Sequence, residues 1–156
     1  MEWSEVVDNP LLRELPFKIE LDKFGKLLMS PASNHHGRSQ MRIGYKLFNH
    51  LPQGEVIAEC SIQTPEGVKV ADIAWASSQF IDTYGYQTPY PKAPELCIEV
   101  VSPSNSKLEI LGKVKLYLEQ GAKEVWLAYE NGKFLTFDHS GEIGQSLLAP
   151  GAQSLD

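Results

Sequence analysis

An acid in the middle of an apolar strand is the feature that most limits how this chain can fold. The segment Pro94–Tyr117, PELCIEVVSPSNSKLEILGKVKLY, carries Glu99 in a run that otherwise resembles a buried strand, followed by a Ser-Pro turn and a helix. A second acid, Asp72, lies in an equally apolar segment, VKVADIAW. Burying an unpartnered carboxylate costs several kcal/mol or forces it to take up a proton. The fold must therefore give both acids a positive partner, and a metal ion is one candidate.

The composition is that of one ordinary globular domain. A length of 156 residues suits a single domain over residues 1–156. Because no stretch approaches about 18 consecutive apolar residues, we expect no membrane span. The N-terminus, MEWSEVVDNP, lacks the pattern of a secretory signal. Cys60 and Cys97 fall in expected strands without metal-ligand spacing, so we expect two buried free thiols and a cytoplasmic protein.

The charge balance narrows the function classes. The chain has 14 basic and 20 acidic residues, which gives a net charge of −6. A general nucleic-acid coat protein carries a basic stripe, so the balance argues against that class. It does not exclude an enzyme that acts on nucleic acid, because active-site carboxylates add negative charge that a bound cation neutralises.

Alternating apolar residues and turn signals predict seven strands. The expected strands are Phe17–Leu21, Lys26–Met29, Glu55–Ile62, Val68–Trp75, Leu96–Val101, Glu124–Tyr129 and Lys133–Asp138. One helix is expected before the third of these strands and one after the fifth. This order predicts an α+β domain with a mixed sheet and helices packed against it.

Local signals mark where the two helices begin and end. The first is expected over residues 36–50, with Ser33 or Asn34 as its cap. The second begins at the capping-box pattern that starts with Ser106 and ends before Gly121. The apolar stripe of the first helix is expected from the helical spacing of Met41, Tyr45 and Phe48, with Leu47 and Leu51 beside it.

Strand periodicity indicates which residues share a face with each acid. The same-face neighbours are small or apolar: Cys97 and Val101 for Glu99, and Val70 and Ala74 for Asp72. The alternative for a single such acid is that it points to solvent from a half-exposed sheet. Two acids on neighbouring strands favour a shared site.

Lys113 is the third member of the expected site. At about 100° per residue it lies on the border of its helix's apolar arc, roughly 40° from Tyr117. The alternative is a surface lysine that covers apolar atoms with its stem. Two carboxylates supply hard oxygen ligands for Mg²⁺ or Mn²⁺, and a nearby lysine orients an attacking water or stabilises charge on phosphate oxygens. These residue types point to phosphodiester hydrolysis.

The chain resembles the Uma family of restriction-endonuclease-like proteins, within the PD-(D/E)XK nuclease superfamily. The resemblance runs from about Glu20 to Phe137 and is carried by MSPASNHHG, AECSIQTPEGVKVADIAW, PELCIEVVSPSN and KVKLYLEQGAKEVWL. It implies a restriction-endonuclease-like core in which one helix precedes three strands, and a helix and a further strand follow. The element order predicted from the residues agrees with that core.

The resemblance also implies roles for individual residues. Asp72 matches the aspartate of the PD element, and Glu99 matches the acid of the (D/E)XK element. With the main-chain carbonyl of Val100, these are the implied ligands of Mg²⁺ or Mn²⁺. The usual lysine two residues after the second acid is missing, because that position is Val101. Its function is expected to come from Lys113.

Three further residues match recurring family positions. His36, at the start of the first helix, suits contact with a phosphate or a metal-bound water, with local helix-start contacts as the alternative. Glu20 and Glu59 are expected near the cleft. Tyr117 and Trp126 are expected in the core.

Two functions remain open at this point. The first is an endonuclease that acts on DNA, or alternatively on RNA. The second is a non-enzymatic nuclease-fold module with a binding or assembly role, which the negative net charge favours. Nuclease domains of this size often pair to cut both strands, so a homodimer fits the first function.

Overall fold

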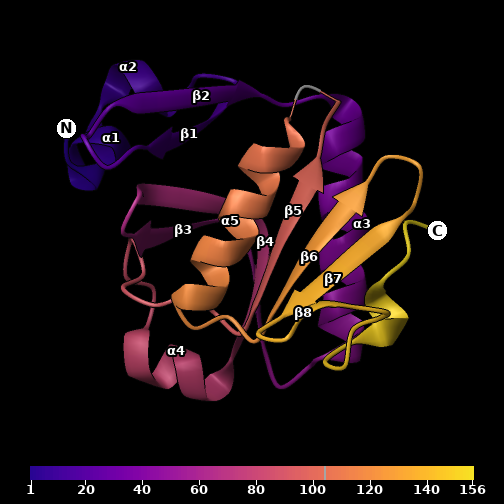
Figure 1. The fold of residues 1–156 in the computed structure, drawn as a ribbon. Helices are drawn as coiled ribbons and strands as arrows, with labels where there is room; N and C mark the ends of the chain where they lie inside the picture. The colour runs from indigo at the N-terminus through magenta and orange to yellow at the C-terminus, as the bar shows by residue number, and fades with distance from the viewer. Residues whose placement is uncertain (104) are drawn as a thin grey trace.

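A mixed sheet of six strands forms the centre of the structure, in the spatial order β3-β4-β5-β6-β7-β8 (Figure 1). The computed structural model describes residues 1–103 and 105–156, so the expected Ser-Pro turn lies partly outside the described residues. The strands are β3 (Gly54–Thr64), β4 (Gly67–Ser77), β5 (Leu96–Val101), β6 (Glu124–Tyr129), β7 (Phe134–Asp138) and β8 (Gly141–Ile143). All neighbours are antiparallel except β5 and β6, which are parallel and joined by helix α5 (Lys107–Glu119). The predicted α+β class is confirmed.

Helices cover both faces of the sheet. α5 lies on one face together with α4 (Ser78–Tyr84), and α3 (Asn34–His50) lies on the other with the short helix η1 (Pro150–Ala152) (Figure 1). The two faces of β5 follow the predicted parity. Cys97 packs into the cluster that contains Val114 of α5, whereas Ile98 packs into the cluster that contains Leu47 of α3.

The N-terminal part forms a separate unit against β4. Two short helices, α1 (Trp3–Asp8) and α2 (Pro10–Arg13), precede a hairpin of β1 (Phe17–Leu21) and β2 (Leu27–Pro31). The Val70 N–H of β4 donates a hydrogen bond of 2.7 Å to Glu20 Oε2. At Gly67, where φ is +96°, an added Cβ would lie 2.2 Å from the carbonyl oxygen of Leu21. Only glycine allows this close approach, so β1 is held tightly against the sheet.

Both long helices begin at the expected caps. Ser33 Oγ accepts a hydrogen bond from the His36 N–H, and the helix begins at Asn34, two residues earlier than expected. Ser106 Oγ accepts one from the Glu109 N–H at the start of α5. These bonds satisfy backbone donors that the first helical turn leaves free.

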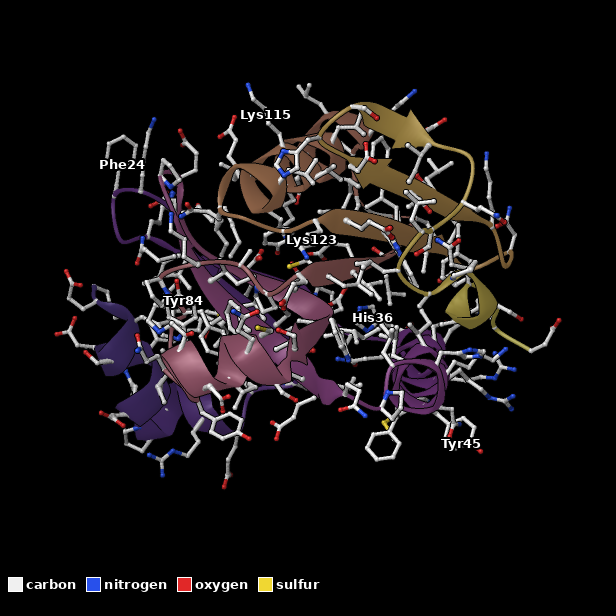
Figure 2. The ribbon with its side chains drawn as sticks, turned by 90° about the horizontal axis from the view of Figure 1, so that it is seen from below. Phe24, His36, Tyr45, Tyr84, Lys115 and Lys123 are labelled. Carbon is white, nitrogen blue, oxygen red and sulfur yellow. The ribbon has the colours of Figure 1, made fainter. Side chains whose placement is uncertain are left out.

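The predicted apolar stripe of α3 is wrong. Met41 and Tyr45 are 74% and 70% exposed, whereas Ile43 and Leu47 are fully buried. The row that faces the sheet runs through Ser39, Ile43 and Leu47 at four-residue spacing, and a small serine begins it. In Figure 2, Tyr45 points away from the sheet, whereas His36 on the same helix points toward it.

Two further expectations concern the whole chain. Cys60 and Cys97 are free and buried, as predicted. Within residues 1–103 and 105–156, no helix is both long enough and apolar enough to cross a membrane.

The face of α3 can be tested by paired substitutions. Ile43→Ala should lower the free energy of unfolding by about 2–5 kcal/mol, because it removes a fully buried side chain and leaves a cavity. Tyr45→Ala should change it by less than about 0.5 kcal/mol, because the ring is exposed. Urea unfolding measures both. A loss at Tyr45 as large as that at Ile43 would show that the outer face is covered in solution.

Candidate active site

The register of β4 and β5 brings the two predicted acids together. Their ladder ends with the pair Ile73 and Ile98, so the next opposed pair in this antiparallel register is Asp72 and Glu99. There the Val100 N–H donates to the carboxylate oxygen Asp72 Oδ2 at 2.7 Å. The two acids are only 1% and 2% exposed. The alternative in which each acid points to solvent is therefore wrong.

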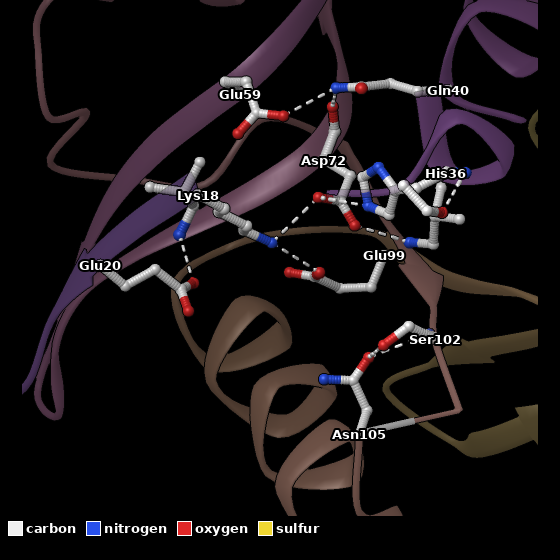
Figure 3. A network of polar contacts seen from close by, with 12 residues as sticks. Lys18, Glu20, His36, Gln40, Glu59, Asp72, Glu99, Ser102 and Asn105 are labelled. Atoms are coloured by element: carbon white, nitrogen blue, oxygen red, sulfur yellow. Dashed lines mark hydrogen bonds and ion pairs between the residues drawn. The ribbon is translucent and has the colours of Figure 1, made fainter. Parts of the chain in front are cut away.

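Lys18 lies between the two carboxylates, and the sequence analysis did not identify it. Its Nζ is 3.0 Å from Asp72 Oδ1 and 2.9 Å from Glu99 Oε2 (Figure 3). The side chain comes from β1 and is 11% exposed. Burial alone would lower the pKa of Lys18, but the charges of Glu99, Asp72 and Glu20 outweigh it and raise this pKa well above its usual value. Lys18 is thus an ammonium ion at the centre of the site.

Lys113 reaches the site from α5. Its Nζ is 3.2 Å from Glu99 Oε1 and 2.7 Å from Glu20 Oε2. The Tyr117 hydroxyl donates to the same Glu99 Oε1 at 2.8 Å. Lys113 is buried, so the alternative of a surface lysine is wrong. Burial alone would raise the pKa of Glu20, but the positive charges of Lys113 and Lys18 outweigh the effect of burial and lower this pKa.

The two central acids have pKa values displaced in opposite directions. Burial alone would raise the pKa of Asp72. The charge of Lys18 and the hydrogen bond with His36 outweigh the effect of burial and hold this pKa far below its usual range. Complete burial raises the pKa of Glu99, and Lys113 and Lys18 offset this only in part. The surroundings of Asp72 therefore favour its ionised form, whereas the burial of Glu99 favours its protonated form.

The first turns of α3 contribute the third side of the site. His36 Nε2 is 3.3 Å from Asp72 Oδ1. Gln40 Nε2 donates to the Asp72 main-chain carbonyl at 2.6 Å and to Glu59 Oε1 at 2.9 Å (Figure 3). Glu59 lies opposite Asp72 in the register of β3 and β4 and has a left-handed φ of +52°. This rare backbone conformation for a non-glycine residue interrupts the ladder beside the site.

A cleft of about 730 Å³ opens over these groups. Its wall includes the predicted residues Glu20, His36, Glu59, Asp72, Glu99 and Lys113, and also Lys18. Glu59 is exposed at the edge of this cleft and, among the described residues, has no ion pair with a basic side chain. Val100 also lines the cleft, but the group that it offers to Asp72 is its N–H. A ligand role for the Val100 carbonyl stays a prediction.

The donor set fits a hard divalent cation in its chemistry. Mg²⁺ is commonly held by one or two carboxylates, with water and phosphate oxygens completing its shell. Asp72 Oδ1 and Glu99 Oε2 already converge on one positive charge, the Lys18 ammonium. In the described part of the chain, no group of three or more His, Cys, Asp or Glu side chains is arranged to hold a metal ion. If such an ion binds here, the side chains that would hold it are the two carboxylates of Asp72 and Glu99.

Three residues of the site escaped the sequence analysis: Lys18, Gln40 and the hydroxyl of Tyr117. For Lys18 a signal existed, because the alternation of Phe17–Leu21 puts Lys18 and Glu20 on the same strand face. Gln40 lies one helical turn after His36, so the two share a face. Tyr117 lies in the core as expected and is fully buried. Nothing in its spacing indicates that its hydroxyl contacts Glu99.

The contact between His36 and Asp72 predicts a pH-dependent contribution to stability. The hydrogen bond with Asp72 raises the pKa of His36 above its usual 6.5. The added stability is fully present below the unfolded-state pKa and is lost as pH rises through the folded-state pKa. We expect His36→Gln to destabilise the metal-free protein more at about pH 5.5 than at about pH 9, measured by urea unfolding. An equal or larger effect at the higher pH would contradict this, and the exposed His139→Gln serves as control.

Comparisons with known proteins identify the family and the fold of the chain. One solved structure, described as "a putative nuclease belonging to DUF820" from Anabaena variabilis ATCC 29413, matches with a TM-score of 0.71 and 16% sequence identity, covering 88% of this chain and 79% of that one. At this identity the likeness establishes the restriction-endonuclease-like fold. A search of curated proteins gives no match. Residues 5–148 match the family model Uma2, described as "Putative restriction endonuclease". The chain therefore belongs to the Uma2 family.

Proposed function

We propose that this protein is a metal-dependent endonuclease that hydrolyses phosphodiester bonds of DNA. The observation that carries the proposal is the placement of Asp72 and Glu99, which are buried side by side on the wall of an open cleft. Lys113 contacts Glu99 in the same cleft. The description of the family and the fold of the Anabaena structure support a nuclease.

Each residue has a role in this proposal. Asp72 and Glu99 would hold Mg²⁺ or Mn²⁺, and such an ion supplies a Lewis acid for the phosphate and lowers the pKa of a bound water. Lys113 positions the attacking water or offsets negative charge that builds up on the phosphate oxygens. Glu20 holds Lys113 in place by its 2.7 Å ion pair. His36 contacts Asp72 and lines the cleft, where it can contact a phosphate.

One observation favours a second function, a nuclease-fold module that binds or assembles without catalysis. Lys18 already neutralises both acids through contacts of 3.0 and 2.9 Å. A buried cluster whose charges are paired within the chain can be part of the folded structure without taking part in catalysis. Cleavage assays separate this function from the first.

The two acids should be essential for cleavage. Asp72→Asn and Glu99→Gln keep the side-chain shapes but remove charged metal ligands, so each should reduce cleavage about 100-fold or more. The measurement is the loss of supercoiled plasmid and of single-stranded DNA in Mg²⁺ or Mn²⁺. Glu66→Gln is the matched control, because Glu66 is an exposed acid paired with Lys23. If the wild type cleaves neither DNA nor RNA and binds no Mn²⁺ in calorimetry, the endonuclease proposal is wrong.

Lys113→Met should separate catalysis from metal binding. The variant keeps an apolar stem of similar length but loses the ammonium that contacts Glu99. We expect cleavage to fall about 100-fold while Mn²⁺ binding persists, because the lost charge acts on the phosphate and not on the ion. Lys115→Met, on the exposed side of α5, should cleave like the wild type. Wild-type activity in a folded Lys113→Met protein would show that α5 does not supply the missing lysine function.

A further inference from the structure

Lys18 lies between the two acids of the site and contacts both of them. Its Nζ touches both Asp72 Oδ1 and Glu99 Oε2. Among the residues that the structure describes, Lys18 is the one cation that forms an ion pair with both acids. It enters from β1, which belongs to a different sheet from the strands that carry the acids.

The remaining carboxylate oxygens are committed to other partners. Asp72 Oδ2 accepts the Val100 N–H, and Glu99 Oε1 accepts from Lys113 and Tyr117. The two oxygens that hold Lys18 are Glu99 Oε2 and Asp72 Oδ1, and the latter also lies 3.3 Å from His36 Nε2. A divalent ion held by both acids through these two oxygens would need the place that the Lys18 ammonium occupies. The ammonium and the ion cannot both lie there, because they would overlap and repel each other.

We propose that Lys18 is an internal counter-ion that holds the Asp72–Glu99 pair when no divalent ion is bound, and that it must leave the pair for a divalent ion to bind. This inference rests on the metal site of the proposed function. Binding is then an exchange of one cation for another, and the apparent affinity for metal is the intrinsic affinity multiplied by the fraction of molecules in which Lys18 has left the pair. Lys113 stays in place, because its contacts are with Glu20 and with the other oxygen of Glu99.

Calorimetric titration with Mn²⁺ tests the exchange. Lys18→Met keeps the apolar stem and removes the competing charge, so Mn²⁺ should bind at least about tenfold more tightly than to the wild type. Lys23→Met is the matched control, because it removes the same charge from the turn of the same hairpin, where Lys23 is exposed and pairs with Glu66. It should bind Mn²⁺ like the wild type.

Three outcomes of the titration are distinguishable. Tighter binding by Lys18→Met alone supports the counter-ion. Binding by the wild type with equal or weaker binding by Lys18→Met overturns the counter-ion and leaves the proposed metal site standing. The absence of binding by both proteins overturns the counter-ion and the metal site together.

Lysine labelling of the wild type keeps the inference testable if Lys18→Met does not fold. In metal-free protein, reductive methylation followed by mass spectrometry should leave Lys18 and Lys113 protected and modify Lys115, whose side chain is 78% exposed. Adding Mn²⁺ should make Lys18 reactive while Lys113 stays protected, and EDTA should reverse the change. Protection of Lys18 at every Mn²⁺ concentration would overturn the proposal.

Discussion

Repulsion between two neighbouring carboxylates is the constraint on which the rest of this structure depends. The antiparallel register of β4 and β5 makes Asp72 and Glu99 neighbours at the point where the ladder ends. Two neighbouring buried carboxylates repel each other, and this arrangement is strongly unfavourable without positive partners. The elements around the sheet meet this need, because β1 brings Lys18, α5 brings Lys113 and the first turn of α3 brings His36. Each of these three elements packed around the acids thus carries one of the basic side chains that compensate their charge.

The surrounding contacts make the two acids chemically unequal although their positions are nearly equivalent. Asp72 accepts a backbone N–H and lies beside Lys18 and His36, which lower its pKa. Glu99 is more deeply enclosed, and its burial outweighs the lysines beside it. The contacts around the pair thus favour the anion of Asp72 more than the anion of Glu99. The Tyr117 hydroxyl and Lys113 fix the orientation of the Glu99 carboxylate.

Much of this arrangement follows from patterns within single segments. Strand parity predicted that Glu99 shares a face with Cys97, and helical geometry placed Lys113 at the edge of a buried arc; the structure bears out both placements. The failures come from contacts between segments. The spacing of Met41 and Tyr45 is helical, but spacing alone does not tell which side of a helix meets the sheet, and the side with Ser39 does. Lys18 was missed because its role depends on how a two-stranded hairpin docks on a sheet whose acids lie 54 and 81 residues later.

The β1–β2 hairpin supplies charged side chains that the rest of the site needs for its charge balance. The recognisable nuclease core, from the capped start of α3 to β6, contains both acids and Lys113 but neither Lys18 nor Glu20. A fragment trimmed to that core would keep Lys113 beside Glu99 and His36 beside Asp72, but it would lack Lys18, the cation that contacts both acids. Lys113 would also lose one of its two carboxylate partners, Glu20. The tight approach of Gly67 to Leu21 keeps the hairpin at its place on β4. The β1–β2 hairpin therefore completes the charge balance of the site, and a shortened form of the protein needs to keep Phe17–Pro31.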